Sequence, residues 1–306
     1  MKKFFVVRLI KSIITIWFIL SLVFVITRLS GDPTQWILPD DASEATRIEV
    51  RENLGLDRPI SEQYMKMVIG VFNGDAGKSY IYLRPVGDLF AERFGATLQI
   101  GIVAFLIAIA LGVPLGVLAG VKRNSIFDRL TMGASIAGST IPNFVFGILM
   151  IFFFSLLLRL LPSGGTGTLK HYIMPVIALA VGPMASIARL TRSSLLDVLR
   201  QDYLDCARAK GVPEVVVIFK HALRNTLIPV VTIIGLQMGS IIGGSVVVET
   251  VFAWPGIGSL IINAAKSRDF PIIQYGVVLI SIAVTFTNML VDLSYAFLDP
   301  RIRDNF

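Results

Sequence analysis

The segment Gly74-Asp75-Ala76-Gly77-Lys78-Ser79 is the part of the sequence that could bind a nucleotide. A phosphate-binding loop follows a strand and has the spacing G-x-x-x-x-G-K-[ST], so its first glycine would fall at position 72. That position is occupied by Phe72. The spacing excludes a P-loop, and we interpret Gly74 and Gly77 as turn residues. The chain is therefore not predicted to hydrolyse ATP.

Other reactive side chains are isolated. His171 and His221 have no companions at metal-ligand spacing, and the single cysteine, Cys206, excludes both an intrachain disulfide and a cysteine cluster. The run from Gly243 to Val247 lacks the last glycine of a G-x-S-x-G nucleophile elbow. The sequence thus predicts no catalytic site, no cofactor and no metal in this chain.

A more informative pattern covers Asp202–Gly211, which is predicted to be a short amphipathic helix closed by Gly211 at its C′ position. Its small residues permit close approach of a partner chain, and its charged residues can form a rim around that contact. These residues are Asp205, Cys206, Ala207, Arg208, Ala209 and Lys210. A docking helix and a solvated interfacial helix both fit this pattern.

Composition places these residues in a membrane protein. The 306 residues are 54% hydrophobic and 16% charged, whereas a soluble domain has about 25% charged residues. The formal charge of +7 could indicate nucleic acid, but basic residues beside apolar segments are more typical of cytoplasmic loops. We expect membrane lipid, and no nucleic acid, as the surroundings.

Uncharged runs long enough to cross a bilayer predict an all-α polytopic protein with about six spans, because a hydrocarbon core of about 30 Å needs roughly 20 helical residues. The predicted spans are Ser12–Thr27, Gly95–Val121, Leu130–Leu158, Tyr172–Ala188, Asn225–Val248 and Phe270–Val291. The fourth is the shortest of the later five, and Pro175 and Pro183 predict a kink in it. The first span could be a signal peptide, but no A-x-A-like cleavage site follows it, which favours an uncleaved helix.

Lysine and arginine in short loops predict the orientation, since such loops resist translocation. Alternating the six spans places most of these residues on one side, which predicts that both termini are cytoplasmic. Segment 31–94 then lies outside as a small folded region, and segment 191–226 is cytoplasmic. The predicted domains are 1–30, 31–94 and 95–306. Apolar residues expected to pack inside the external region are Trp36, Ile48, Leu54, Tyr64, Met67 and Phe72.

Polar residues within spans are candidates for the transport pathway, because burying them without partners is costly. The candidates are Gln237, Ser240, Asn288 and Asp292. Asn288 and Asp292 share a helix face at i and i+4, so helix packing is an alternative role. Glycines in the fifth span could instead face a partner helix or shape a pore.

The run Asp205-Cys206-Ala207, followed by Gly211, Leu223 and Pro229, resembles the EAA signature of membrane subunits of binding-protein-dependent ABC importers. Asp205 replaces the usual glutamate, Cys206 the first alanine, and Arg224 stands where many members have proline. Further resemblance to the peptide and nickel permease branch extends along nearly the whole chain. It includes Gly31-Asp32-Pro33, Ala96-Thr97-Leu98, Arg192-Ser193-Ser194, the run from Glu249 to Gly258, and Asp299-Pro300-Arg301.

This resemblance implies a type I ABC importer permease fold in the bacterial cytoplasmic (inner) membrane. It also implies a second homologous permease chain, two ATPase subunits that bind ATP and Mg, and a periplasmic or lipid-anchored solute-binding protein. The coupling residues would be Asp205, Cys206, Ala207, Arg208, Lys210 and Gly211. External gate or binding-protein contacts would be Phe252, Trp254, Pro255 and Gly256. The implied cargo is di- or oligopeptides or glutathione, with nickel chelates or oligosaccharides as alternatives. A stand-alone secondary transporter or channel is the rival interpretation.

Overall fold

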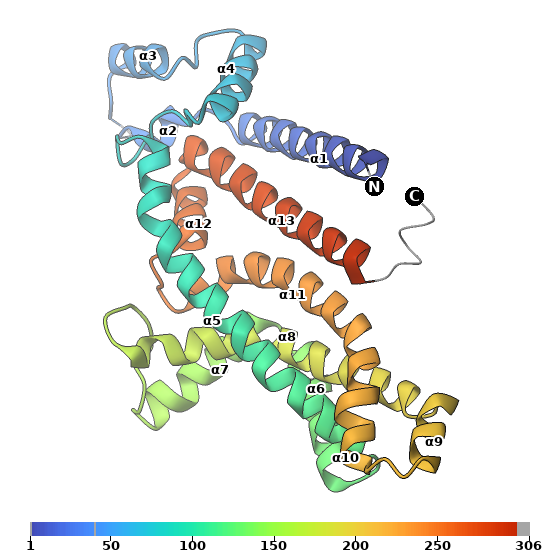
Figure 1. Ribbon diagram of the computed structural model, residues 1–306. Coiled ribbons are helices and arrows are strands. Elements are labelled where there is room, and N and C mark those ends of the chain that lie inside the picture. The colour runs from blue at the N-terminus through green and yellow to red at the C-terminus, as the bar shows by residue number, and fades with distance from the viewer. Residues whose placement is uncertain (1, 40, 299–306) are drawn as a thin grey trace. The chain divides into compact units, whose positions relative to one another are not determined.

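The computed structural model describes residues 2–39 and 41–298, and this part of the chain is helical throughout apart from its turns and one isolated bridge (Figure 1). The predicted all-α class is therefore confirmed. The helices are α1 (Lys2–Leu29), α2 (Thr34–Ile37), α3 (Glu44–Asn53), α4 (Ile60–Asn73), α5 (Val86–Val121), α6 (Ile126–Thr140), α7 (Asn143–Met150), η1 (Ile151–Leu157), α8 (Leu169–Val198), α9 (Asp202–Ala209), α10 (Glu214–Val216), η2 (Val217–Ala222), α11 (Leu223–Val251), α12 (Ile257–Ser267) and α13 (Phe270–Leu298).

Five helical segments among the described residues are long and apolar enough to cross a membrane, and a bent pair raises the count to six if it forms one span. The five are Val6–Leu29, Val86–Val121, Leu169–Val198, Glu214–Val251 and Phe270–Val291. The predicted short fourth span belongs to the 30-residue helix α8, which continues through Pro175 and Pro183. The number of spans predicted from the sequence is thus consistent with the structure.

The third predicted span, Leu130–Leu158, is not one continuous helix. The structure divides it into Ile126–Thr140 and Asn143–Leu157, which are bent by 105°. Between them Ile141 has an extended backbone with φ −76° and ψ 122°. Pro142 explains the break, because a proline has no N–H to donate and disfavours the helical conformation of the residue before it.

The described chain forms two compact units. Of the described residues, the larger unit contains Leu98–Trp254 and 286–298, and the smaller unit contains 2–39, 41–97 and 255–285. Within the larger unit α8 packs against α6, α7 and α11 (Figure 1).

A stripe of three glycines lets the backbone of α5 approach α8 in the larger unit. A Cβ atom added at Gly116 would lie 2.5 Å from the Ala188 carbonyl oxygen, and one added at Gly112 would lie 2.9 Å from that of Met184. At Gly120 the neighbour is the side chain of Leu195, at 2.9 Å. The i, i+4, i+8 spacing puts all three glycines on one helix face, the arrangement by which membrane helices pack closely.

The smaller unit has an apolar core where the start of α5 meets α12 and α13. Val86 and Phe90 pack there with Leu260, Ile261 and Ile272, all of them buried. Asp269, which is 1% exposed, fixes the turn before α5 by accepting hydrogen bonds from the Ser79 hydroxyl and from the backbone N–H groups of Tyr80 and Ile81. Burial raises the pKa of Tyr80 to about 12, so its phenol stays protonated.

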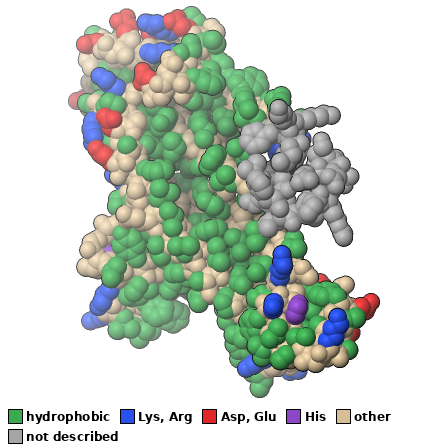
Figure 2. Space-filling model, in the orientation of Figure 1, with side chains coloured by type: hydrophobic (Ala, Val, Ile, Leu, Met, Phe, Trp, Pro, Cys, Tyr) green, Lys and Arg blue, Asp and Glu red, His purple; other side chains and the backbone are tan. Residues whose placement is uncertain are grey.

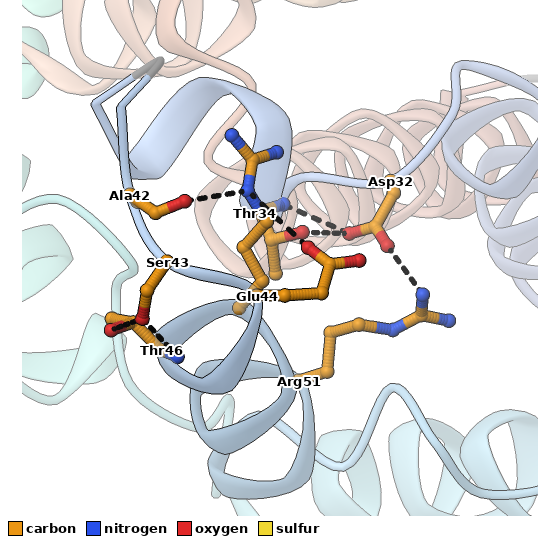
Figure 3. Close-up of polar contacts among 8 residues, drawn as sticks. Asp32, Thr34, Ala42, Ser43, Glu44, Thr46 and Arg51 are labelled. Carbon is orange, nitrogen blue, oxygen red and sulfur yellow. Dashed lines mark hydrogen bonds and ion pairs between the residues drawn. The ribbon is translucent and has the colours of Figure 1, made fainter.

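The predicted external region contains three short helices, α2, α3 and α4. Figure 3 shows how Asp32, which follows α1 along the chain, connects α2 to α3. One carboxylate oxygen of Asp32 accepts from the backbone N–H and the hydroxyl of Thr34, at 2.9 and 2.7 Å, and the other pairs with Arg51 of α3 at 3.2 Å. Ser43 caps α3 by accepting from the Thr46 N–H.

The prediction that this region packs its apolar residues inside is wrong for Ile48 and Phe72, which are 54% and 83% exposed. Leu54, Tyr64 and Met67 are partly buried, and the side chain of Trp36 lies outside the described residues. Neither α3 nor α4 has a buried residue. The reason is geometric, because short helices held mainly by polar contacts along one edge enclose no interior of their own.

Replacing Gly116 by alanine should destabilise the protein, because the new methyl group would collide with the rigid backbone of α8. We expect a loss of about 1–3 kcal/mol in the free energy of unfolding. The matched control is Gly133→Ala in α6, where an added Cβ meets no atom within 4 Å. The control should gain up to about 1 kcal/mol from helix propensity. Thermal unfolding in detergent measures both, and equal melting temperatures would contradict the close packing.

Candidate functional site

Helix α9 ends as the sequence predicted, with Gly211 in the left-handed conformation at φ +77°. The Gly211 N–H donates to the Arg208 carbonyl at 2.9 Å, and the Val212 N–H donates to the Ala207 carbonyl at 3.2 Å. These two bonds form a Schellman motif, which satisfies carbonyls left open at a helix end. An added Cβ at Gly211 would meet no atom within 4 Å, so its surroundings are open.

The inner face of α9 is anchored by Leu204, which is fully buried. It packs with Val117 of α5, Leu195 of α8, and Val217 and Ala222 of η2. Ala207 and Val212 are partly buried against the same cluster, which we call the α9 anchor. The anchor therefore joins α9 to three other elements of the larger unit.

The outer face of α9 carries polar and small side chains. Asp205, Cys206, Lys210 and Gly211 are exposed, whereas Ala207 and Arg208 are partly buried. Of the six predicted coupling residues, the structure therefore places four at the surface of this chain. Figure 2 shows charged side chains gathered over the α9 and α10 segments.

Arg208 holds the loop after α9. Its guanidinium donates to Glu214 at 3.1 and 3.0 Å and to Asp205 at 2.8 Å. The bonds to Glu214 and Asp205, in that order of size, raise the pKa of Arg208 above its ordinary value. Arg208 therefore remains protonated and links the helix to the start of α10.

Tyr203 attaches α9 to α11. Its hydroxyl accepts from the Asn225 side-chain amide at 2.7 Å and donates to the His221 carbonyl at 3.4 Å. The α9 anchor and this polar link together connect α9 to α5, α8, η2 and α11.

A partly buried ion pair, not predicted from the sequence, joins α6 to α8. Arg192 contacts both carboxylate oxygens of Asp128, at 2.5 and 2.7 Å. Asp128 is 2% exposed and also accepts from the Asn124 N–H at 2.9 Å, while Ser125 caps the helix. The Ser-x-x-Asp pattern at the start of α6 is a capping signal that could have pointed to Asp128, but its arginine partner lies 64 residues away.

At the other end of α11, Phe252 and Trp254 are only 1% exposed. The Phe252 carbonyl accepts from the Gly165 N–H at 2.8 Å. The Trp254 ring makes an edge contact with Tyr172, at 4.6 Å between centroids, and the Tyr172 hydroxyl donates to Gln99 at 2.8 Å. Both predicted contact residues thus point into the larger unit rather than toward its surface.

Pro255 and Gly256 belong to the smaller unit and differ in exposure. Pro255 is exposed, whereas Gly256 is buried and caps α12. The first N–H of that helix, from Ile257, donates to the Thr97 hydroxyl at 2.8 Å. Of the four predicted external residues, Pro255 alone is exposed.

The predicted pathway residues lie on α11 and α13. Ser240 is exposed and donates to the Gln237 side-chain oxygen at 2.9 Å. Asn288 is exposed and lies beside Gly239, where an added Cβ would be 3.7 Å from the asparagine oxygen. The side chain of Asp292 lies outside the described residues. The structure therefore locates Gln237, Ser240 and Asn288, and the first two are hydrogen-bonded to each other.

The described residues contain no group of three or more histidine, cysteine or acidic side chains that could hold a metal ion. His171 instead closes the start of α8, where its ring lies 2.9 Å from the Thr168 hydroxyl.

Comparison with known families matches almost the entire chain. Residues 112–304 match the family described as "Binding-protein-dependent transport system inner membrane component". Residues 1–101 match the N-terminal family described as "Binding-prot-dependent transport system membrane comp, N-term".

Relatives and solved structures agree with these matches. The chain is 41% identical over 304 residues to the "Glutathione transport system permease protein GsiC" of Pectobacterium atrosepticum and of Escherichia coli K12, covering 99% of both chains in each case. A structure of the MetNI methionine ABC transporter in an inward-facing conformation aligns with a TM-score of 0.58 and 20% identity, over 69% of this chain and 96% of that one. An amino acid ABC transporter with histidines aligns with the same TM-score and 15% identity, over 69% and 94%. The protein is thus a multi-pass inner-membrane permease subunit that belongs to the binding-protein-dependent ABC importer family, in its peptide and nickel branch.

Proposed function

We propose that this chain forms part of the translocation path of an importer for glutathione and related small peptides. The observation that carries the proposal is the 41% identity, over 99% of both chains, to a permease named for glutathione transport. Family membership also argues against the stand-alone transporter, since the family description makes transport depend on a binding protein.

In the proposed assembly a second, homologous permease pairs with this one, two ATPase subunits bind ATP and Mg, and a solute-binding protein delivers the cargo. The Lys and Arg distribution over six spans supports the proposal that both termini are cytoplasmic. This orientation would put α9 on the side where ATP is available.

We propose α9 as the coupling helix that docks on an ATPase subunit. Asp205, Cys206, Lys210 and Gly211 would face the partner, because they are exposed. Ala207 and Arg208 would hold this exposed surface in place. Ala207 packs against the α9 anchor, and Arg208 binds Asp205 and Glu214. A helix held on its inner face in this way can pass a displacement of its outer face to α5 and α8.

For the pathway we propose Gln237, Ser240 and Asn288, whose polar groups lie on exposed or half-buried surfaces of α11 and α13. At the external end we propose that Pro255 is the residue available to the binding protein or gate. Phe252 and Trp254 would shape this loop from inside, because both are buried.

Transport of labelled glutathione tests the proposed substrate. The chain would be expressed with its cognate permease, ATPase and binding protein in cells that lack glutathione uptake, and accumulation would be measured with and without competing dipeptides. We expect uptake that needs all four components. Uptake of a nickel chelate or an oligosaccharide, with none of glutathione or peptides, would refute the substrate while leaving the importer assignment in place.

Gly211→Arg should abolish ATPase docking, because bulk and charge would enter the open space beside α9. The residue must also keep φ +77°, which costs a side chain other than Asn or Asp about 1–2 kcal/mol. Gly211→Asn is the matched control, since asparagine tolerates this conformation and adds no charge. Co-purification of the ATPase measures docking. The docking role fails if Gly211→Arg retains as much ATPase as wild type.

Leu204→Ala should loosen α9 without altering its exposed face. Removing a buried leucine costs about 2–5 kcal/mol, and here the loss falls on the α9 anchor. We expect faster amide hydrogen exchange across 202–212 and weaker coupling of ATP hydrolysis to transport. Val215→Ala, at a side chain that is 66% exposed, is the control. Unchanged exchange in Leu204→Ala would show that the anchor does not hold α9.

A further inference from the structure

Helix α4 has two apolar faces. One carries Tyr64 and Val71, which are partly buried. The other carries Met65, Ile69 and Phe72 at i, i+4 and i+7, and these side chains are 53%, 51% and 83% exposed. The two faces are adjacent around the helix, since 3.6 residues per turn separate Tyr64 and Met65 by about 100°. We call the uncovered face the α4 stripe.

The polar residues of α4 occupy the remaining side. Glu62 and Lys66 are exposed there, and Glu62 pairs with Arg58 at 2.5 Å. A helix with a wide apolar face and a charged face is typical of segments that lie in the plane of a membrane interface. In Figure 2 charged side chains gather over α3, and hydrophobic side chains lie over the neighbouring α4.

The level of α4 follows from its contact with α1. The Tyr64 hydroxyl lies 2.7 Å from the Ser21 hydroxyl, and its ring makes an edge contact with Phe24 at 5.3 Å. Ser21 precedes the end of the Val6–Leu29 span by eight residues, or about 12 Å of helix. This span is about 36 Å long against a hydrocarbon core of about 30 Å, so the tip of Tyr64 reaches roughly 9 Å inside the core boundary.

The α1 residues near this level are themselves uncovered. Leu22, Val25 and Ile26 are 47%, 50% and 52% exposed. The apolar surface of a membrane span is thus continuous with a helix that follows it along the chain. Because Tyr64 reaches Ser21 directly, α4 lies within one side-chain length of this level, in the region where tyrosines gather at the membrane–water interface.

We infer that the α4 stripe is a membrane-binding surface, inserted among the lipids of the leaflet at the C-terminal end of α1. Met65, Ile69 and Phe72 contact the lipid acyl chains, Tyr64 hydrogen-bonds to the span, and Glu62 and Lys66 face water. The partner is phospholipid, because Tyr64 fixes the helix at that depth. The α4 stripe thereby ties the external segment to the bilayer as well as to α1.

Spin labels at the stripe test this inference in the full chain, co-expressed with its transport partners and reconstituted into phospholipid bilayers. Single cysteines replace Met65, Ile69 or Phe72 in a Cys206→Ser background, so that each protein carries one label. Because all three side chains are exposed, the substitutions remove little packing. Collision with oxygen, which partitions into lipid, is compared with collision with a water-soluble nickel chelate.

Lys66→Cys is the matched control, one residue from Met65 but on the polar side of α4. We expect the oxygen-to-nickel ratio at the stripe to exceed that at position 66 several-fold. Nickel collision as high as at position 66 would place the stripe in water and overturn the inference. Low collision with both reagents would show that another protein chain covers it, which overturns the inference equally.

Discussion

The close packing of α5 on α8 is the constraint on which the larger unit depends. Gly112, Gly116 and Gly120 remove three side chains from one helix face, so that carbonyl oxygens and side chains of α8 occupy their place. In lipid no hydrophobic force drives such helices together, and tight van der Waals packing must supply much of the attraction. The same stripe sets the position of Leu195 beside Gly120, and Leu195 in turn contacts Leu204 of α9. The position of α9 is therefore fixed by contacts that begin inside the spans.

Helix α9 illustrates why tertiary packing, not local propensity, determines its place. It has eight residues, fewer than the roughly 12–15 at which isolated helices become even marginally stable. The ion pair between Arg208 and Glu214 is open to solvent, which screens the attraction between its charges, so it contributes little. Burial of one leucine contributes about 1.5–3 kcal/mol. The larger contribution to the stability of α9 therefore comes from its inner face.

Hydropathy, Gly211 and the resemblance to a known family were sufficient to predict the class of fold, the helical spans and the end of α9. The sequence could not show which apolar residues have a neighbour, and Ile48 and Phe72 were wrongly placed inside a packed region. It also missed the break at Pro142, because the uncharged run was taken as one span although the proline inside it is a readable breaking signal. The Asp128–Arg192 pair was missed because its members are far apart along the chain. The α5 glycines have the same readable i, i+4, i+8 spacing as the glycines of α11, but a close helix contact was among the predicted roles only for α11.

Hydrogen-bond saturation separates structural polar residues from those free to meet a passing substrate. Asp128 receives two bonds from Arg192 and one from a backbone N–H, so its carboxylate has little capacity left. Such a pair resists separation, since removing Arg192 would leave the buried Asp128 carboxylate without its compensating charge. Gln237 receives one bond from Ser240, and its amide donors contact no acceptor among the described residues. An importer that must release its cargo benefits from pathway groups whose bonding is incomplete, and this criterion favours Gln237 as a proposed pathway residue and a structural role for Asp128.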